Sequence, residues 1–245
     1  MSGGRHLIVN ADDFGLSSGV NLGIIKAREN GVVTSASLMV RWPAAAEAAD
    51  YGREHPSFSV GLHVDLGEWT YRDGEWKPVY EVVTFEDVNG VTSEILSQLD
   101  AFRRLTNRNP THIDSHQHVH LREPVRSILV DIACRLGVPL RHYSSEARYC
   151  GDFYGQTREG SPLPDAISPG SLLRILEAMP DGLTELACHP GEGNDLETEY
   201  RSERSQEVET LCDPRVREMI TAKHIVLCSF HNVTHFLRAT EPPAR

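Results

Sequence analysis

The stretch Leu7-Ile-Val-Asn-Ala-Asp12-Asp13-Phe-Gly15 decides how the chain is organised. Its apolar first half is typical of a buried strand, and it leads directly into two adjacent carboxylates and a glycine. A carboxylate in apolar surroundings is strongly disfavoured unless a metal ion or a cationic group pairs with it. Taken alone, such a pair is more often a solvated turn that caps the next helix. The rest of the chain must therefore decide between these interpretations.

Composition indicates one globular domain without a basic surface. The chain has 245 residues, 40% of them hydrophobic, which is enough for a substantial core. Acidic residues outnumber basic ones by 35 to 24, and the net charge of −11 argues against a nucleic-acid partner. Neither a signal peptide nor an apolar run of membrane-spanning length is present, and the five cysteines show no paired spacing. We therefore expect a cytoplasmic protein with reduced thiols and no membrane partner.

Strand-like and helix-like segments alternate along the chain. Strands are predicted at residues 6–12, 32–40, 57–66, 111–116, 138–143, 183–189 and 224–230. Helical patterns occur at residues 17–31, 43–55, 91–105, 124–136, 170–179 and 207–223, the last interrupted by a proline. This alternation is typical of parallel βαβ units. Seven strands predict a single-domain α/β fold of (β/α) barrel-like type, with an open doubly wound sheet as the alternative.

Three long connections, at residues 67–90, 144–169 and 191–205, interrupt this alternation. The first contains several tryptophans and tyrosines, so it is either a binding lid or a loop packed by its own aromatic rings. No segment reads as a linker between domains. We therefore expect one domain over residues 1–240 and a disordered tail at residues 241–245.

Polar side chains gather at the predicted carboxyl ends of four strands, where ligands bind in both candidate architectures. These residues are Asp12, Asp13, His63, Asp65, Asp114, His116 and His189. Two imidazoles and one carboxylate from different strands form a three-ligand site with open positions, which is what a hydrolytic metal needs. A second carboxylate could then be the general base, and a further histidine could be the general acid.

Not all of these residues can be ligands. In Asp114-Ser-His116-Gln-His118-Val-His120 the polar residues share one face only while the strand continues, so His116 is favoured over the later histidines. Each histidine could instead be hydrogen bonded to a loop. Adjacent strand residues also face opposite ways, so Asp12 and its neighbour can serve one site only if the chain turns, which we expect at Phe14-Gly15.

Four segments, in this order, resemble the signature segments of the YdjC-like carbohydrate deacetylase family. They are Asn10-Ala-Asp-Asp-Phe-Gly15, Gly61-Leu-His63, Pro110-Thr-His-Ile-Asp-Ser-His116-Gln-His-Val-His120 and Cys188-His-Pro-Gly191. The family includes chito-oligosaccharide deacetylases, which remove acetyl groups from N-acetylglucosamine units. The resemblance runs from about Leu7 to Phe230, and four motifs in succession are far more specific than any one of them.

The resemblance implies a (β/α) barrel-like fold and one divalent metal ion, either Mg, Zn or another transition metal. The implied ligands are Asp13, His63 and His116. By similarity to metal-dependent sugar deacetylases, Asp12 would be the base and His189 the acid. Arg141 could orient the base, although an arginine that covers the rim with its aliphatic stem is equally compatible with the sequence.

A small carbohydrate would be the substrate, bound near Asn10, Phe14 and His118, and the family makes a homodimer plausible. Two rival functions stay open. One is a metal-dependent phosphoesterase, which would use Asp65, Asp114 and His118 to hold a second metal ion. The other is a non-catalytic sugar-binding protein in which the rim histidines are structural.

Overall fold

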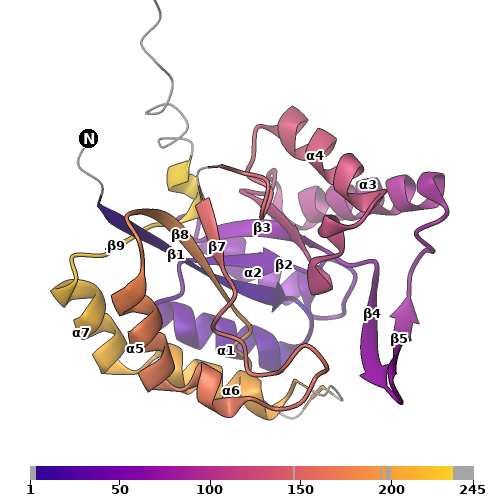
Figure 1. Cartoon of the computed structure of the whole chain (residues 1–245). Coiled ribbons are helices and arrows are strands. Elements are labelled where there is room, and N and C mark those ends of the chain that lie inside the picture. Colours follow the sequence, from indigo (N-terminus) through magenta and orange to yellow (C-terminus); the bar gives the residue numbers. More distant parts are fainter. Residues whose placement is uncertain (1–3, 146, 194, 197–199, 234–245) are drawn as a thin grey trace, which may run out of the picture.

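The computed structural model, which describes residues 4–145, 147–193, 195–196 and 200–233, shows a parallel α/β fold (Figure 1). Seven strands form one sheet in which every pair is parallel. They are β1 (Arg5–Phe14), β2 (Ser35–Leu38), β3 (Ser59–Val64), β6 (Ile113–Ser115), β7 (Ala147–Cys150), β8 (Gly182–Cys188) and β9 (Val226–Leu227). The order is β6-β3-β2-β1-β8-β7, and β9 pairs with β1. The predicted α/β fold with seven parallel strands is confirmed.

Helices flank this sheet (Figure 1). Most buried apolar side chains form one large cluster, and a smaller cluster contains Ile8, Leu183, Phe230 and Val233. The α-helices are α1 (Ser18–Glu29), α2 (Ala45–Glu54), α3 (Val88–Thr106), α4 (Val125–Leu136), α5 (Pro169–Ala178), α6 (Ser202–Leu211) and α7 (Pro214–Ala222). Three short 3-10 helices are η1 (His116–Leu121), η2 (Pro164–Ile167) and η3 (Phe230–Asn232). The largest core cluster includes side chains from β1 through α7, as a single domain requires.

The sheet is curled rather than flat. One guanidinium, that of Arg141, lies 2.8 Å from Asp114 on β6 and 2.7 Å from Glu185 on β8. These two strands are four positions apart in the sheet, which in a flat sheet would separate them by about 19 Å. Curling brings both strands to the same side chain, and this gives the barrel-like shape that the sequence predicted.

The first predicted loop contains regular structure that the sequence interpretation missed. Residues 67–81 form an antiparallel hairpin of β4 (Gly67–Arg72) and β5 (Glu75–Glu81). Its turn is Asp73-Gly74, with φ of 56° and 83°. An Asp-Gly pair with positive φ at both residues is typical of the two-residue turn that matches strand twist. The signal was therefore present in the sequence.

The prediction of a fifth strand at residues 138–143 is wrong. Only Leu140 makes a parallel bridge, to Ile113, and the chain then turns, with the backbone N–H groups of Tyr143 and Ser144 donating to the Leu140 carbonyl. This turn uses backbone groups that a strand would need for its neighbour. The sheet is completed by β7, from within the second predicted loop. The last predicted strand is shortened to Val226–Leu227.

The remaining expectations concern the cysteines, a membrane span and the C-terminal tail. All five cysteines are free, as their spacing predicted. No helix in the described ranges is long and apolar enough to cross a membrane. The tail predicted at residues 241–245 lies outside the described residues.

Candidate active site

A bulge at the end of β1 brings both adjacent carboxylates into one polar cluster. Asp13 has a φ of 66°, and the register between β1 and β2 shifts between Ala11 and Phe14. In a regular strand two adjacent side chains would face opposite sides of the sheet. The predicted turn therefore begins one residue earlier than expected, at Asp13, and Gly15 continues it with a φ of 94°. Aspartate enters this left-handed region more readily than most residues.

The three residues that the sequence predicted as metal ligands lie together. Oδ1 of Asp13 is 3.4 Å from Nε2 of His63 and 3.3 Å from Nδ1 of His116. One ligand atom from each residue falls within 4.8 Å of the others. Within the described part of the chain, this buried carboxylate oxygen has no aligned hydrogen-bond donor. An oxygen flanked by two ring nitrogens and lacking a donor fits a divalent metal ion.

Further charged groups hold these three residues in place. Nδ1 of His63 donates to Asp114 at 2.8 Å, the kind of carboxylate contact that orients a metal-binding imidazole. Burial lowers the pKa of His63, but Asp114 and Asp13 outweigh it and raise that pKa to about 10. Arg204 donates to the other oxygen of Asp13 at 2.7 Å. Burial raises the pKa of Asp13, but Arg204 and the two histidines hold it well below its ordinary value.

Asp12 is held as an ionised carboxylate by Arg141. The guanidinium donates to both oxygens of Asp12, at 2.6 and 2.7 Å, and the Asn10 side chain donates to one of them at 2.8 Å. Burial raises the pKa of Asp12, but the ion pair outweighs it, and the pKa is lowered. Because Arg141 is only 4% exposed, it does not cover the rim as the alternative interpretation suggested. Its position is the one expected of a residue that orients Asp12.

Glu185 on β8 is a member of this cluster that the sequence interpretation missed. It accepts a hydrogen bond from Nε of Arg141 at 2.8 Å. Burial raises its pKa to about 7, because the nearby carboxylates of Asp114 and Asp12 add to burial and the arginine offsets them only in part. Glu185 stands in the middle of an otherwise mostly apolar strand, and a buried charge there needs a partner of opposite charge. Its position in the sequence was therefore the signal that could have identified it. Arg204 was missed because it lies on α6, far from the motifs.

His189 lies on the other side of Asp12. Its Nε2 is 3.9 Å from Oδ2 of Asp12, and its backbone N–H donates to Glu207. The ring packs edge-on against Tyr154, with centroids 5.3 Å apart. Burial lowers the pKa of His189 to about 4 despite the nearby carboxylates. Its Nδ1 is buried and has no partner among residues that the structure describes. The predicted acid is therefore next to the predicted base.

Two of the three residues predicted to contact the substrate are fully buried. The side-chain amide of Asn10 donates a hydrogen bond to Asp12, and Asn10 is fully buried. Phe14 is also fully buried and packs edge-on against Phe58, with centroids 6.2 Å apart. Neither side chain offers an exposed face in this structure, and their contact with a substrate stays a prediction. His118 is hydrogen bonded to His142 and Tyr149, and its contact with a substrate stays a prediction.

A curled parallel sheet with carboxylates and imidazoles at its strand ends defines a class of α/β proteins with a candidate three-ligand metal centre. The chain belongs to the YdjC-like family, whose model, described as YdjC-like protein, matches residues 6–222. It is 31% identical over 247 residues to a carbohydrate deacetylase of Geobacillus stearothermophilus, covering 92% of this chain and 97% of that protein. The membership predicted from the four motifs is confirmed.

Two other similarities cover nearly the whole chain. A chitooligosaccharide deacetylase of Serratia marcescens is 30% identical over 262 residues, covering 93% of this chain and 98% of that protein. A solved structure from Enterococcus faecalis V583, of a protein named for a proposed cleavage of cellobiose phosphate, is 27% identical. It matches with a TM-score of 0.76 over 94% of this chain and 99% of its own. The chain therefore matches these proteins over nearly their full length, and the solved structure shares its fold.

Proposed function

We propose that the protein is a metal-dependent deacetylase that hydrolyses the acetamide of an N-acetylated sugar. The substrate is an N-acetylglucosamine-containing oligosaccharide or a related amino sugar. The observation that carries the proposal is the convergence of Asp13, His63 and His116, with Asp12 and His189 beside them. The activities named for the two curated relatives support it.

Asp13, His63 and His116 would hold the metal ion. Such an ion polarises the acetyl carbonyl and lowers the pKa of a water molecule. Because two of the three donors are imidazoles, we propose a transition ion such as Zn, Co, Ni or Mn rather than Mg, which prefers oxygen ligands. Metal content after purification without added metal tests this choice.

Asp12 is the proposed general base. Arg141 keeps its carboxylate ionised near neutral pH, so it can accept a proton from the attacking water. The same guanidinium and the Asn10 amide fix both carboxylate oxygens, so the acceptor is oriented before the substrate arrives.

His189 is the proposed general acid. Since burial lowers its pKa to about 4, the ring is neutral at the start of the reaction and must first gain a proton. Nε2 of His189 and Oδ2 of Asp12 are 3.9 Å apart, which is longer than a hydrogen bond, so the two groups must move closer for a proton taken from water to pass between them. His189 then donates that proton to the departing amine, which completes the hydrolysis.

The test separates metal binding from catalysis. Asp12→Asn should keep the metal ion but lose acetate release at least about 100-fold, because the base is removed while the ligands stay. His116→Ala should lose both, because it removes a ligand. Asp65→Asn is the matched control, since Asp65 is a buried carboxylate that binds Trp42 and Tyr80 instead. An Asp12→Asn enzyme with full activity would show that the roles of the pair are wrong.

The phosphoesterase alternative has less support. Of its proposed additional ligands, Asp65 is occupied by Trp42 at 3.0 Å and Tyr80 at 2.8 Å, and His118 lies in a different network. A second metal ion whose binding depended on Asp65 and Asp114 would favour that alternative. If the metal-bound protein released acetate from none of the acetylated sugars, the result would favour the non-catalytic sugar-binding alternative.

We further propose that the protein is a cytoplasmic homodimer. The five free thiols are typical of a reducing compartment. The dimer is an expectation from the family resemblance alone. Light scattering should give twice the chain mass of 27.3 kDa, and a mass of 27.3 kDa would contradict it.

A further inference from the structure

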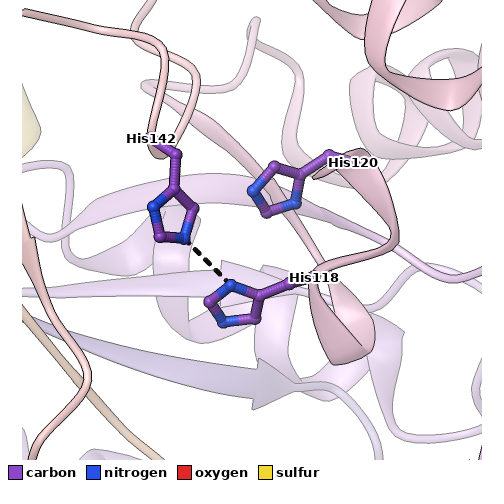
Figure 2. Close-up of side chains that lie close together, drawn as sticks. All are labelled: His118, His120 and His142. Atoms are coloured by element: carbon purple, nitrogen blue, oxygen red, sulfur yellow. Dashed lines mark hydrogen bonds between the residues drawn. The ribbon is translucent and has the colours of Figure 1, made fainter. Parts of the chain in front are cut away.

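A second group of histidines lies outside the cluster around Asp13. His118 and His120 come from η1, and His142 comes from the turn that follows Leu140. Figure 2 shows the three imidazoles facing one another. Their ring centroids are 5.1 to 5.6 Å apart, and one ring nitrogen from each lies within 4.8 Å of the others.

The spacing of two of these nitrogens suits a shared ion. Nδ1 of His118 and Nε2 of His142 are 3.0 Å apart (Figure 2). Two nitrogens bound to one tetrahedral zinc ion, each about 2.05 Å from it, lie about 3.3 Å apart. Little movement would thus convert this pair from a hydrogen bond to two metal ligands.

The third histidine has a ring nitrogen without a partner. His120 is completely buried, and its Nδ1 lies 2.6 Å from the Ser115 hydroxyl. Its Nε2 is buried and, in the ranges that the structure describes, has no hydrogen-bond partner. A buried polar atom left in this state is costly, and a ligand relieves the cost.

The outer contacts of the cluster resemble those of a metal-binding site. Nε2 of His118 lies 3.2 Å from the Tyr149 hydroxyl, so His118 and His120 each have one ring nitrogen held by a hydroxyl and the other turned to the cluster. Such contacts fix the ring orientation of metal ligands. Gln117 and His118 have φ of 47° and 54°, so η1 is kinked between His116, which lies beside Asp13, and His118, which belongs to the second cluster.

We propose that His118, His120 and His142 form a second cation site that binds Zn²⁺, Cu²⁺ or Ni²⁺ but not Mg²⁺. Three imidazoles without a carboxylate select these ions by ligand softness. The site connects η1, which follows β6, to the turn after Leu140, where the sheet makes only a single bridge. Binding would therefore tie these two segments together, and His118 would act as a ligand rather than a substrate contact.

Zinc stoichiometry tests the proposal independently of activity. Equilibrium dialysis should give two zinc ions per wild-type chain, and one in His63→Ala or in Asp13→Asn, either of which disables the first site. His142→Gln should weaken the binding of the second zinc ion at least 100-fold. The double variant His63→Ala/His142→Gln should bind no zinc ion tightly. His118→Gln is the alternative if His142→Gln does not fold. His55→Gln, which alters a histidine outside both clusters, is the control.

Copper gives a spectroscopic check on the ligands. Cu²⁺ bound to His63→Ala should show imidazole nitrogen couplings in electron paramagnetic resonance, and these should be absent from the double variant. One zinc ion in the wild type and none in His63→Ala would overturn the proposal. A second zinc ion that persisted in the double variant would also overturn it, because that ion would lie elsewhere. Neither result depends on whether acetate is released.

Discussion

At the scale of single residues, the electrostatics of the site depend on Arg141. Its buried guanidinium contacts the carboxylates of Asp12, Asp114 and Glu185, each from a different strand. Breaking a buried charge pair leaves uncompensated charges and is strongly destabilising. Arg141 therefore both stabilises the curled sheet and sets the position of the proposed base.

Arg141→Met should lower the free energy of unfolding by about 3–5 kcal/mol, because the carboxylates lose their buried counter-charge. Arg141→Lys keeps the charge but not the planar fork that binds both oxygens of Asp12. It should fold and yet reduce kcat about tenfold or more. Urea denaturation and initial rates of acetate release check the two variants, and an unchanged kcat in Arg141→Lys would contradict the positioning role.

Glu207 should make stability depend on pH. Burial raises the pKa of its carboxyl to about 8, although contacts from Tyr200 and His189 lower it in part. A folded pKa above the unfolded value of 4.5 means that this stabilisation is complete below about pH 4.5 and is lost as pH rises through 8. Between pH 5 and 9, the unfolding free energy of Glu207→Gln should therefore fall less than that of the wild type. Equal slopes in urea denaturation would contradict this.

At the scale of elements, strands could be predicted where the local sequence shows an apolar run that leads into polar residues. The strands that end near Asp13, His63 and His116 could be identified from short apolar runs that lead into polar residues, and the structure brings these three residues together. β7 could not be identified from the sequence. It has only four residues, which are partly exposed, and it lies at the edge of the sheet beside β8. Arg204 depends on long-range packing of α6, which no local pattern encodes.

The end of β1 should not tolerate a side chain at Gly15. A Cβ there would lie 3.0 Å from atoms of Leu38, Met39 and Ala45, and the φ of 94° disfavours any other residue. Gly15→Ala should lower the free energy of unfolding by about 1–3 kcal/mol. Gly170→Ala is the control, because its nearest neighbours are 3.9 Å away or more and alanine suits a helix. Equal stability of the two variants in urea would contradict the strain at Gly15.

At the scale of the whole molecule, alternation of strands and helices was sufficient to predict a parallel α/β fold, because every βαβ unit must bury its helix against the sheet. The same pattern predicted a barrel-like sheet but left an open doubly wound sheet as the alternative. The contacts of Arg141, which join β6 and β8 although these strands are far apart in the sheet order, show that the sheet is curled. The sequence predicted which residues end the strands, whereas the bulge at Asp13 became clear only from the backbone.

A main core cluster that includes side chains from most of the strands and helices predicts one cooperative unfolding transition. Far-ultraviolet circular dichroism and tryptophan fluorescence should report the same urea midpoint, because the core cluster joins strands and helices from β1 to α7. Two separated transitions would contradict the single domain expected over residues 1–240.

The most direct test of the central claim is acetate release from N-acetylglucosamine oligosaccharides, measured side by side for metal-loaded wild type and metal-loaded Asp12→Asn. The account predicts that the wild type releases acetate and that Asp12→Asn, with the same metal content, releases at least about 100-fold less. Equal rates for the two proteins, or no acetate from any N-acetylated sugar with metal bound at Asp13, His63 and His116, would contradict it.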